Sequence, residues 1–353
     1  GIGKAAKLLT GPKPQGIWDN FFSYWYDAVL SGPRTHTTIQ AASAMVSAYQ
    51  PFELVMGGAI TRNRSAIQQG ILEWKMLSDS FGESLEFAKQ SFKENRSIGR
   101  PDNSVVGEAA KKVTGSSVDA PTWQAQSARW LADKWHIPTK LIRAGDEFWQ
   151  QMNYRAVTKA SLAREGMDMG LRGSALDKHI QEGLSRVIYQ GQFLSFKQLY
   201  KRGIDEARAR GVLDPQARNL DALAYVKSNM KQLEEDGLIE FTERASRRGY
   251  ETTASAPLEA GTVGKTLQDF TTKHPVARLF MPFVKSQVNI AKWAGQRFDY
   301  LSLGQIMAAQ RMPSYAQALE ESKRIMVQDI LSNNPIRKAE AVGKFATDRK
   351  SVV

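Results

Sequence analysis

Apolar residues recur at spacings of three and four over much of this chain, and this period limits the folds that it can adopt. Between residues 65 and 95 they form one stripe that includes Ile67, Ile71, Trp74 and Phe81. Such spacing is typical of an amphipathic helix, whereas the alternation of Val, Ile and Thr that marks β-strands is nearly absent. We therefore predict an all-α fold, an elongated multi-helix assembly with long loops and no substantial sheet.

The densest cluster of aromatic residues lies in the run WDNFFSYWYDAVLSGPR, residues 18–34. Its rings occupy six of nine consecutive positions and belong to Trp18, Phe21, Phe22, Tyr24, Trp25 and Tyr26. Side chains with so much apolar area need to be covered. A helix over 18–30 is expected to end at Gly32 and Pro33, because Gly favours the left-handed C-terminal position and Pro does not continue a helix. We expect these rings, with Pro33 and Arg34, to contact a neighbouring subunit or a preceding domain.

Shifts in composition divide the chain into six predicted regions. Residues 96–121 are rich in Gly, Ser, Asp and Lys, and residues 244–264 in Arg, Gly, Ser and Pro, which is typical of long loops. The predicted regions are an N-terminal aromatic and Ala-rich helical region (1–96), a linker (97–121), a central helical region (122–242), a basic loop (243–264), a C-terminal helical region (265–332) and a basic mobile tail (333–353).

Proline and capping residues predict where individual helices begin and end. Pro51 is expected to close one helix, Pro138 to open another and Asp214 to cap a third, because Pro fits the first helical turn and Asp accepts from free amides there. The resulting predictions are helices over 37–49, 139–167 and 215–235, with 238–242 as a candidate strand.

Charge and cysteine content narrow the classes of function. The 353 residues carry a formal net charge of +12 and include no cysteine. Without cysteine, disulfides, thiolate metal sites and Cys nucleophiles are excluded. The positive charge favours a polyanionic partner, either a nucleic acid or an anionic membrane face, with improved solubility as the equally weighted alternative.

The segment that comes closest to a membrane span is Thr35–Ile60. It has few charges, but Thr, Ser, Gln and His are scattered through it and Glu53 follows Pro51. A spanning helix needs about 20 mostly apolar residues. We therefore expect a helix rich in Ala and Ser that packs closely on a neighbour.

No pattern for catalysis, a cofactor or a metal emerges. The four histidines lack the spacing of metal ligands, and the run from Gly261 to Thr266 lacks the first glycine of a phosphate-binding loop. Adjacent carboxylates on a helix do not face each other across a cleft. Glu147 is the best isolated acid, because Phe148 and Trp149 would desolvate it. We expect no enzymatic activity and no cofactor in this chain.

Clusters of basic residues are the remaining candidate binding sites. Mobile cations bind phosphates without fixed geometry, and a neighbouring Tyr stacks on bases. A solvated loop is the alternative of equal weight. The candidate contacts to DNA or phosphate are Arg244, Arg247, Arg248 and Tyr250 in the predicted basic loop, and Lys338 and Lys344 in the predicted tail.

Three segments occur in the order LSGPRTH (30–36), IPTKLIRAGDEFWQQMNYRA (137–156) and HPVARLFMPFVKSQVNIAKW (274–293). Together they resemble a helical region of very large phage proteins, namely the internal virion or ejection proteins of short-tailed phages and related large polyvalent proteins. The matching residues are Ser31, Gly32, Pro33, Arg34, Pro138, Arg143, Asp146, Glu147, Phe148, Pro282, Phe283, Val284 and Asn289. Of these, the resemblance suggests structural roles for Arg143, Asp146, Phe148, Pro282 and Phe283.

The resemblance implies a fragment of a structural ejection protein that forms part of an oligomeric channel for the viral genome across the host envelope. The implied partners are further copies in a ring or tube, other internal virion proteins, double-stranded DNA without sequence specificity, and the host inner membrane. The implied location is the virion interior, then the host periplasm and inner membrane. The alternative is a nucleic-acid-binding accessory module of a phage or mobile-element protein. A third reading is a peptidoglycan-cleaving enzyme, which predicts turnover that is lost on changing one carboxylate; flanking regions outside this chain could also carry such a domain.

Overall fold

The computed structural model describes residues 33–100, 137–255, 265–266, 268–270, 288–290 and 327–346. Over these residues the fold is all-α, as predicted, apart from one hairpin of two-residue strands. The helices are α3 (Pro33–Ile60), α4 (Arg64–Asp79), α5 (Phe81–Glu94), α8 (Ile137–Asp168), α9 (Ser174–Val187), α10 (Phe196–Ala209), α11 (Pro215–Glu235), α12 (Leu238–Thr252) and α18 (Pro335–Ala346). The predicted aromatic helix over 18–30 lies outside the described residues.

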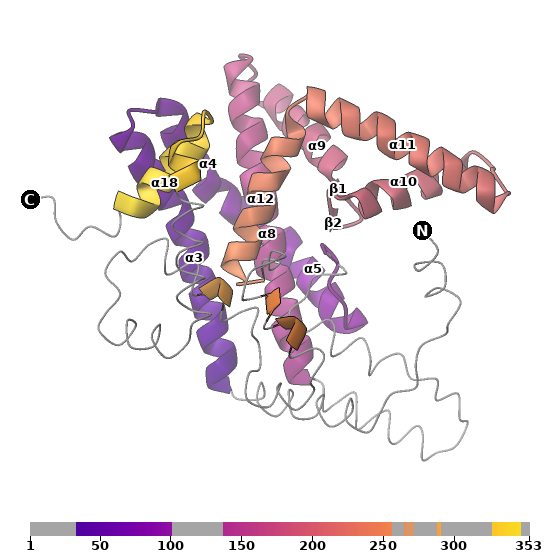
Figure 1. The fold of residues 1–353 in the computed structure, drawn as a ribbon, viewed down its shortest axis with the longest axis horizontal. Coiled ribbons are helices and arrows are strands. Elements are labelled where there is room, and N and C mark those ends of the chain that lie inside the picture. The colour runs from indigo at the N-terminus through magenta and orange to yellow at the C-terminus, as the bar shows by residue number, and fades with distance from the viewer. Residues whose placement is uncertain are drawn as a thin grey trace, which may run out of the picture.

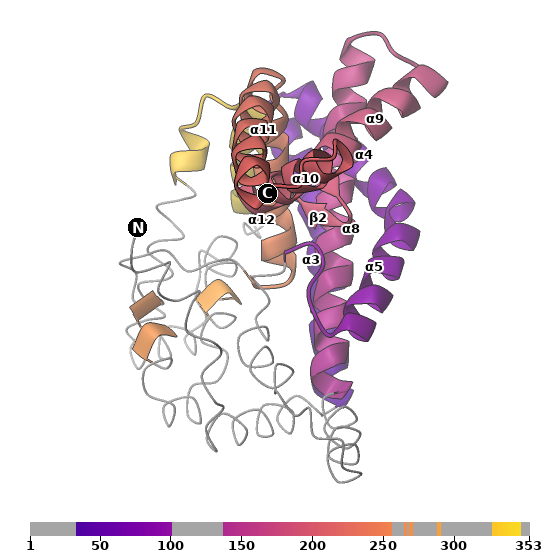
Figure 2. The same cartoon turned by 90° about the vertical axis from the view of Figure 1, so that its right-hand side faces the viewer.

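Helix α8 is the central element (Figure 1), and its span confirms the helix predicted over 139–167. Helices α4, α5, α9 and α12 pack against it, and Figure 2 shows α5 running beside it. Ala156, Ala160 and Ala163 of α8 are almost fully buried, and these small side chains let the neighbouring helices approach closely. They meet Leu184 of α9 and Leu199 of α10 in the main apolar core.

Helices α10 and α11 form a pair that projects from the bundle (Figure 1). Ser195 caps α10 by accepting from the Gln198 amide at 3.1 Å. Asp214 caps α11 and Pro215 occupies its first turn, so the predicted start of this helix is confirmed. A Cβ added at Gly203 would lie 2.8 Å from the backbone of Ala222, which shows how closely the two helices pack.

A two-residue turn joins the strands β1 (Ile188–Tyr189) and β2 (Gln192–Phe193). Gln190 and Gly191 both have positive φ, 50° and 75°. A type I′ turn requires positive φ at both central positions. The hairpin places the Phe193 ring 4.1 Å from that of Tyr154 on α8, in a stacked arrangement.

Several predicted boundaries are wrong. Pro51 lies inside α3 instead of ending a helix. The stripe over 65–95 is split between α4 and α5 at Ser80. The candidate strand 238–242 and the first ten residues of the predicted basic loop, 243–252, belong to α12. Tertiary packing overrides local composition here, because α12 lies along α8.

The predicted mobile tail is also wrong in part, because α18 occupies its centre and crosses α3. The close approach of α3 and α18 requires glycine at two positions. A Cβ at Gly57 would overlap the carbonyl group of Ala339, and a Cβ at Gly343 would overlap that of Glu53. The expectation that Thr35–Ile60 forms a helix packed closely on a neighbour is therefore confirmed.

Candidate functional site

Two of the three arginines predicted to lie in a basic loop are held inside the protein, which corrects that prediction. Arg244 and Arg248 lie on α12 with exposed fractions of 9% and 0%. Their side chains point between helices because α12 packs against α8 and α3. They cannot reach a DNA backbone without breaking the ion pairs they make in the interior.

Two buried glutamates from distant parts of the chain neutralise these arginines. Glu73 of α4 accepts from Arg244 Nη2 at 2.5 Å, and Glu340 of α18 accepts from Arg244 Nε at 3.2 Å. Arg248 Nη2 lies 3.5 Å from Glu340 Oε1 and 3.9 Å from Glu73 Oε2. The ion pairs therefore join α4, α12 and α18. We call Glu73, Arg244, Arg247, Arg248 and Glu340 the buried charge cluster.

Glu340 sits at the centre of this cluster and is 1% exposed. Burial opposes its ionisation, but Arg248, Arg247, Lys344 and Arg244 outweigh that effect and hold the pKa of Glu340 well below its ordinary value. The carboxylate therefore stays charged, and opposite charges within about 4–6 Å are the cause.

The other predicted DNA contacts have different surroundings. Arg247 is partly exposed but pairs with Asp329 at 3.0 Å. Lys344, placed in a mobile tail by the sequence, is buried in α18 and lies 3.2 Å from Glu251. Tyr250 is half-buried, with the Arg100 guanidinium 3.7 Å above its ring. Lys338 is exposed, so of these residues it alone keeps the environment expected of a phosphate contact.

Glu147 anchors the first residues of the predicted linker, 97–99, to α8. Its side chain is 1% exposed and accepts from Ser97 Oγ at 2.7 Å and from the amides of Ile98 and Gly99 at 2.9 and 2.8 Å. Gln151 Nε2 donates to it at 2.7 Å. These hydrogen bonds make Glu147 a structural acceptor, not an acid facing a cleft.

Replacing Glu147 with alanine should release the segment 97–99 from α8. The two buried amides would lose their acceptor, and each unsatisfied buried group costs about 1–3 kcal/mol. We expect a lower free energy of unfolding in urea and faster hydrogen exchange at Ile98 and Gly99. The matched control is Glu86→Ala on the exposed surface of α5. Equal stability of the two variants would contradict the anchoring role.

Helix α3 turns its polar side chains inward. Ser43, Ser47, Gln50 and Glu53 are at most 3% exposed. Ser43 Oγ donates to the Thr252 carbonyl at 3.1 Å, and Gln50 Nε2 donates to a Glu251 oxygen at 3.0 Å. Ser43 and Gln50 therefore serve the contact between α3 and α12.

The outward side of α3 is apolar. Its large exposed residues follow spacings of four, three, four and four, which places them along one side of the helix. They are Met45, Tyr49, Phe52, Met56 and Ile60, and we call them the α3 apolar face. Met45 is 74% exposed and Ile60 is 52% exposed. The only charged residue between positions 40 and 60 is Glu53, which is buried, so this face carries no charge.

Helix α4 likewise exposes apolar side chains and buries polar ones. An apolar stripe normally faces the core. Here Ile71 and Trp74 are 54% and 41% exposed, whereas Gln69 and Glu73 are buried. Trp74 Nε1 donates to the Ala48 carbonyl of α3 at 2.8 Å, so its ring borders the α3 apolar face.

Residues singled out by the phage-protein resemblance lie partly in α8. Arg143 Nη1 donates to the Asn95 side chain at 2.6 Å, and Asp146 is buried. The Phe148 ring meets that of Phe81 edge-on at 5.2 Å. Pro33 and Arg34 belong to the first turn of α3. The remaining candidates, Trp18, Phe21, Phe22, Tyr24, Trp25, Tyr26, Pro282 and Phe283, lie outside the described residues.

Sequence reasoning missed the two glutamates of the buried charge cluster. Glu73 sits between Leu72 and Trp74, and Glu340 lies in a basic segment. The available signal was three arginines within five residues of a possible helix, which require buried acids if that helix packs inside.

Within the described residues, no cluster of side chains suits a metal ion. None of the described helices is long and apolar enough to cross a membrane.

Comparison of the chain with protein families, curated proteins and solved structures found no match.

Proposed function

We propose that this chain is a structural subunit of a homo-oligomer. Following its resemblance to phage internal virion proteins, we propose further that the oligomer conducts the viral genome across the host envelope. The observation that supports assembly is the α3 apolar face, which exposes large apolar side chains while the polar residues of the same helix are buried. Exposed apolar patches with this continuity mark interaction surfaces.

A second copy of the chain suits this face best. Spacings of three and four let the side chains of two such helices interdigitate, as they do in coiled coils. The face has no charged side chain to recognise a nucleic acid or an acidic partner. Closed assemblies of identical subunits are the commonest oligomers of soluble proteins.

The nucleic-acid-binding module has less support as an alternative. Arg244, Arg248 and Lys344 make their ion pairs inside the protein, so they are not available as mobile phosphate contacts. The net charge of +12 still suits a channel wall along which DNA slides, since diffuse charge binds phosphates without reading bases.

The test is to place glutamate on the α3 apolar face, in the double variant Met45→Glu/Phe52→Glu. We expect the wild-type chain to form rings or tubes in mass photometry and cryo-EM class averages. The variant should remain monomeric with unchanged helical content by circular dichroism, because burying two carboxylates opposes association. Leu213→Glu is the matched control, since Leu213 is 87% exposed and lies outside this face.

A monodisperse wild-type monomer under virion-like and membrane-like conditions would contradict the proposal, as would equal loss of assembly in Leu213→Glu.

A further measurement addresses the conducting role. Wild-type assemblies should retain double-stranded DNA in a salt-dependent manner, and the monomeric variant should lose this retention. Assembly without DNA retention would support the structural oligomer but contradict its proposed role as a channel for DNA.

A further inference from the structure

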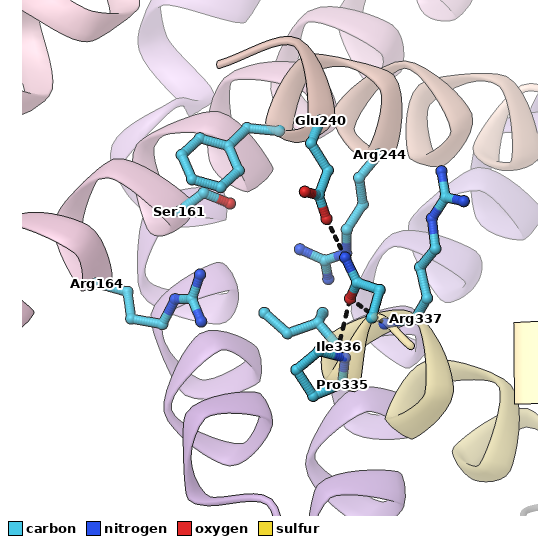
Figure 3. Close-up of a pocket in the computed structure, with 9 residues that line it drawn as sticks. Ser161, Arg164, Glu240, Arg244, Pro335, Ile336 and Arg337 are labelled. Carbon is cyan, nitrogen blue, oxygen red and sulfur yellow. Dashed lines mark hydrogen bonds between the residues drawn. The ribbon is translucent and has the colours of Figure 1, made fainter. Parts of the chain in front are cut away.

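The described part of the chain contains a pocket with a volume of about 170 Å³ between α8, α12 and the start of α18 (Figure 3). Its walls combine guanidinium groups with apolar side chains. The lining residues that matter for its chemistry are Ser161, Arg164, Glu240, Phe241, Arg244 and Arg337. None belongs to the α3 apolar face, so the pocket is separate from the surface proposed for assembly.

The three arginines of the pocket differ in how their charge is balanced. Arg244 is paired with Glu73 and Glu340 inside the protein. Arg337 lies 3.7 Å from Glu243. Arg164 forms no ion pair with any described residue.

Arg164 is a cation with a single neutral hydrogen-bond partner. Its Nη1 donates to Ser65 Oγ at 2.7 Å, and its Nε is buried with no acceptor among the described residues. In Figure 3 its side chain extends from α8 toward the pocket. Burial is the main influence on its pKa and lowers it, which means that the surroundings stabilise the charge less than water does. An oxyanion in the pocket would balance this charge, since guanidinium binds carboxylate and phosphate through paired N–H groups.

The remaining walls favour a carboxylate with an apolar body. Glu240 adds one negative charge and accepts from the Asn334 amide group, as the dashed line in Figure 3 shows. It opposes a doubly charged phosphate more than a single carboxylate. Phe241 and Ile336 supply apolar contacts in the pocket lining. Ser161 Oγ accepts from Gln69 at 3.1 Å, which leaves its hydroxyl proton for a ligand oxygen.

We propose that this pocket binds a small monocarboxylate with an aromatic or branched apolar body, whose carboxylate pairs with Arg164. The volume agrees with this class, because a cavity of about 150 Å³ holds a benzene ring. Benzoate is therefore the probe, and benzamide is its neutral counterpart of the same shape.

The experiment measures binding of benzoate to the full chain by isothermal titration calorimetry and by the shift in melting temperature. We expect saturable binding of benzoate that is at least about tenfold tighter than that of benzamide, since hydrogen bonds to charged groups contribute about 1.5–3 kcal/mol. Arg164→Met should abolish the preference for benzoate. The matched control is Arg202→Met on α10, where an arginine of similar exposure pairs with Glu206 outside the pocket.

Equal affinity for benzoate and benzamide in the wild-type chain would overturn the proposal without the need for any variant. So would an unchanged preference in a folded Arg164→Met protein. Inorganic phosphate is the third probe, and tighter binding of phosphate than of benzoate at the same site would reject the carboxylate assignment. Failure of these tests would leave the assembly proposal unaffected, because the α3 apolar face shares no residue with the pocket.

Discussion

Replacing Glu340 with alanine is expected to lower the free energy of unfolding by about 3–5 kcal/mol, because removal of one partner leaves buried cations uncompensated. Glu340 is 1% exposed and lies within 4 Å of Arg244, Arg247 and Arg248. Its loss removes the acid that joins α18 to α12. The measurement is chemical denaturation followed by circular dichroism.

The matched control is Glu243→Ala, which removes an exposed carboxylate that lies 3.7 Å from Arg337. Exposed ion pairs contribute little, so this variant should remain close to the wild type. If Glu340→Ala were no less stable than Glu243→Ala, the buried charge cluster would contribute nothing to folding.

Acid should weaken the same cluster. The pKa of Glu340 in the folded protein lies well below its ordinary value of 4.5, because nearby arginines and Lys344 outweigh the opposing effect of burial. The stabilisation is therefore complete above the unfolded-state pKa and is lost as pH falls through the folded-state pKa. Melting temperatures measured from pH 6 down to about pH 2 should show this loss in the wild type and a smaller loss in Glu340→Gln.

Replacing Gly57 with alanine should detach α18 from α3. The added Cβ would overlap the backbone carbonyl of Ala339, and backbone atoms cannot move aside as a flexible side chain does. Overpacking of this kind typically costs about 1–3 kcal/mol. Hydrogen exchange should accelerate across residues 335–346, and the unfolding free energy should fall.

Gly82 provides the control for this prediction, because a Cβ at that position on α5 meets no atom within 4 Å. Alanine has the higher helix propensity by about 1 kcal/mol, so Gly82→Ala should be neutral or stabilising. The same substitution is thus expected to act in opposite directions at the two positions. A stabilising effect of Gly57→Ala would show that α18 does not cross α3 in the described manner.

Local patterns in the sequence were sufficient for the fold class and for several helices. The periodicity of three and four, Pro138 and the cap at Asp214 predicted α8 and α11. Each of these signals acts between residues within about four positions, which is the range over which a helix organises its own backbone. The boundaries at α12 and α18 could not be predicted in this way, because their helical state depends on packing against α8 and α3.

The sequence by itself determined that the chain is helical, basic and free of cysteine. Only the tertiary structure decided which side of each helix faces inward and what becomes of the basic residues. Arg244 meets Glu73 across 171 positions and Glu340 across 96, and no local pattern encodes such a pairing. Other distant groups, the Thr252 carbonyl and the Glu251 carboxylate, draw polar side chains of α3 inward and leave Met45, Phe52 and Ile60 outside. Burial of polar groups requires partners, and those partners come together only when the whole chain has folded.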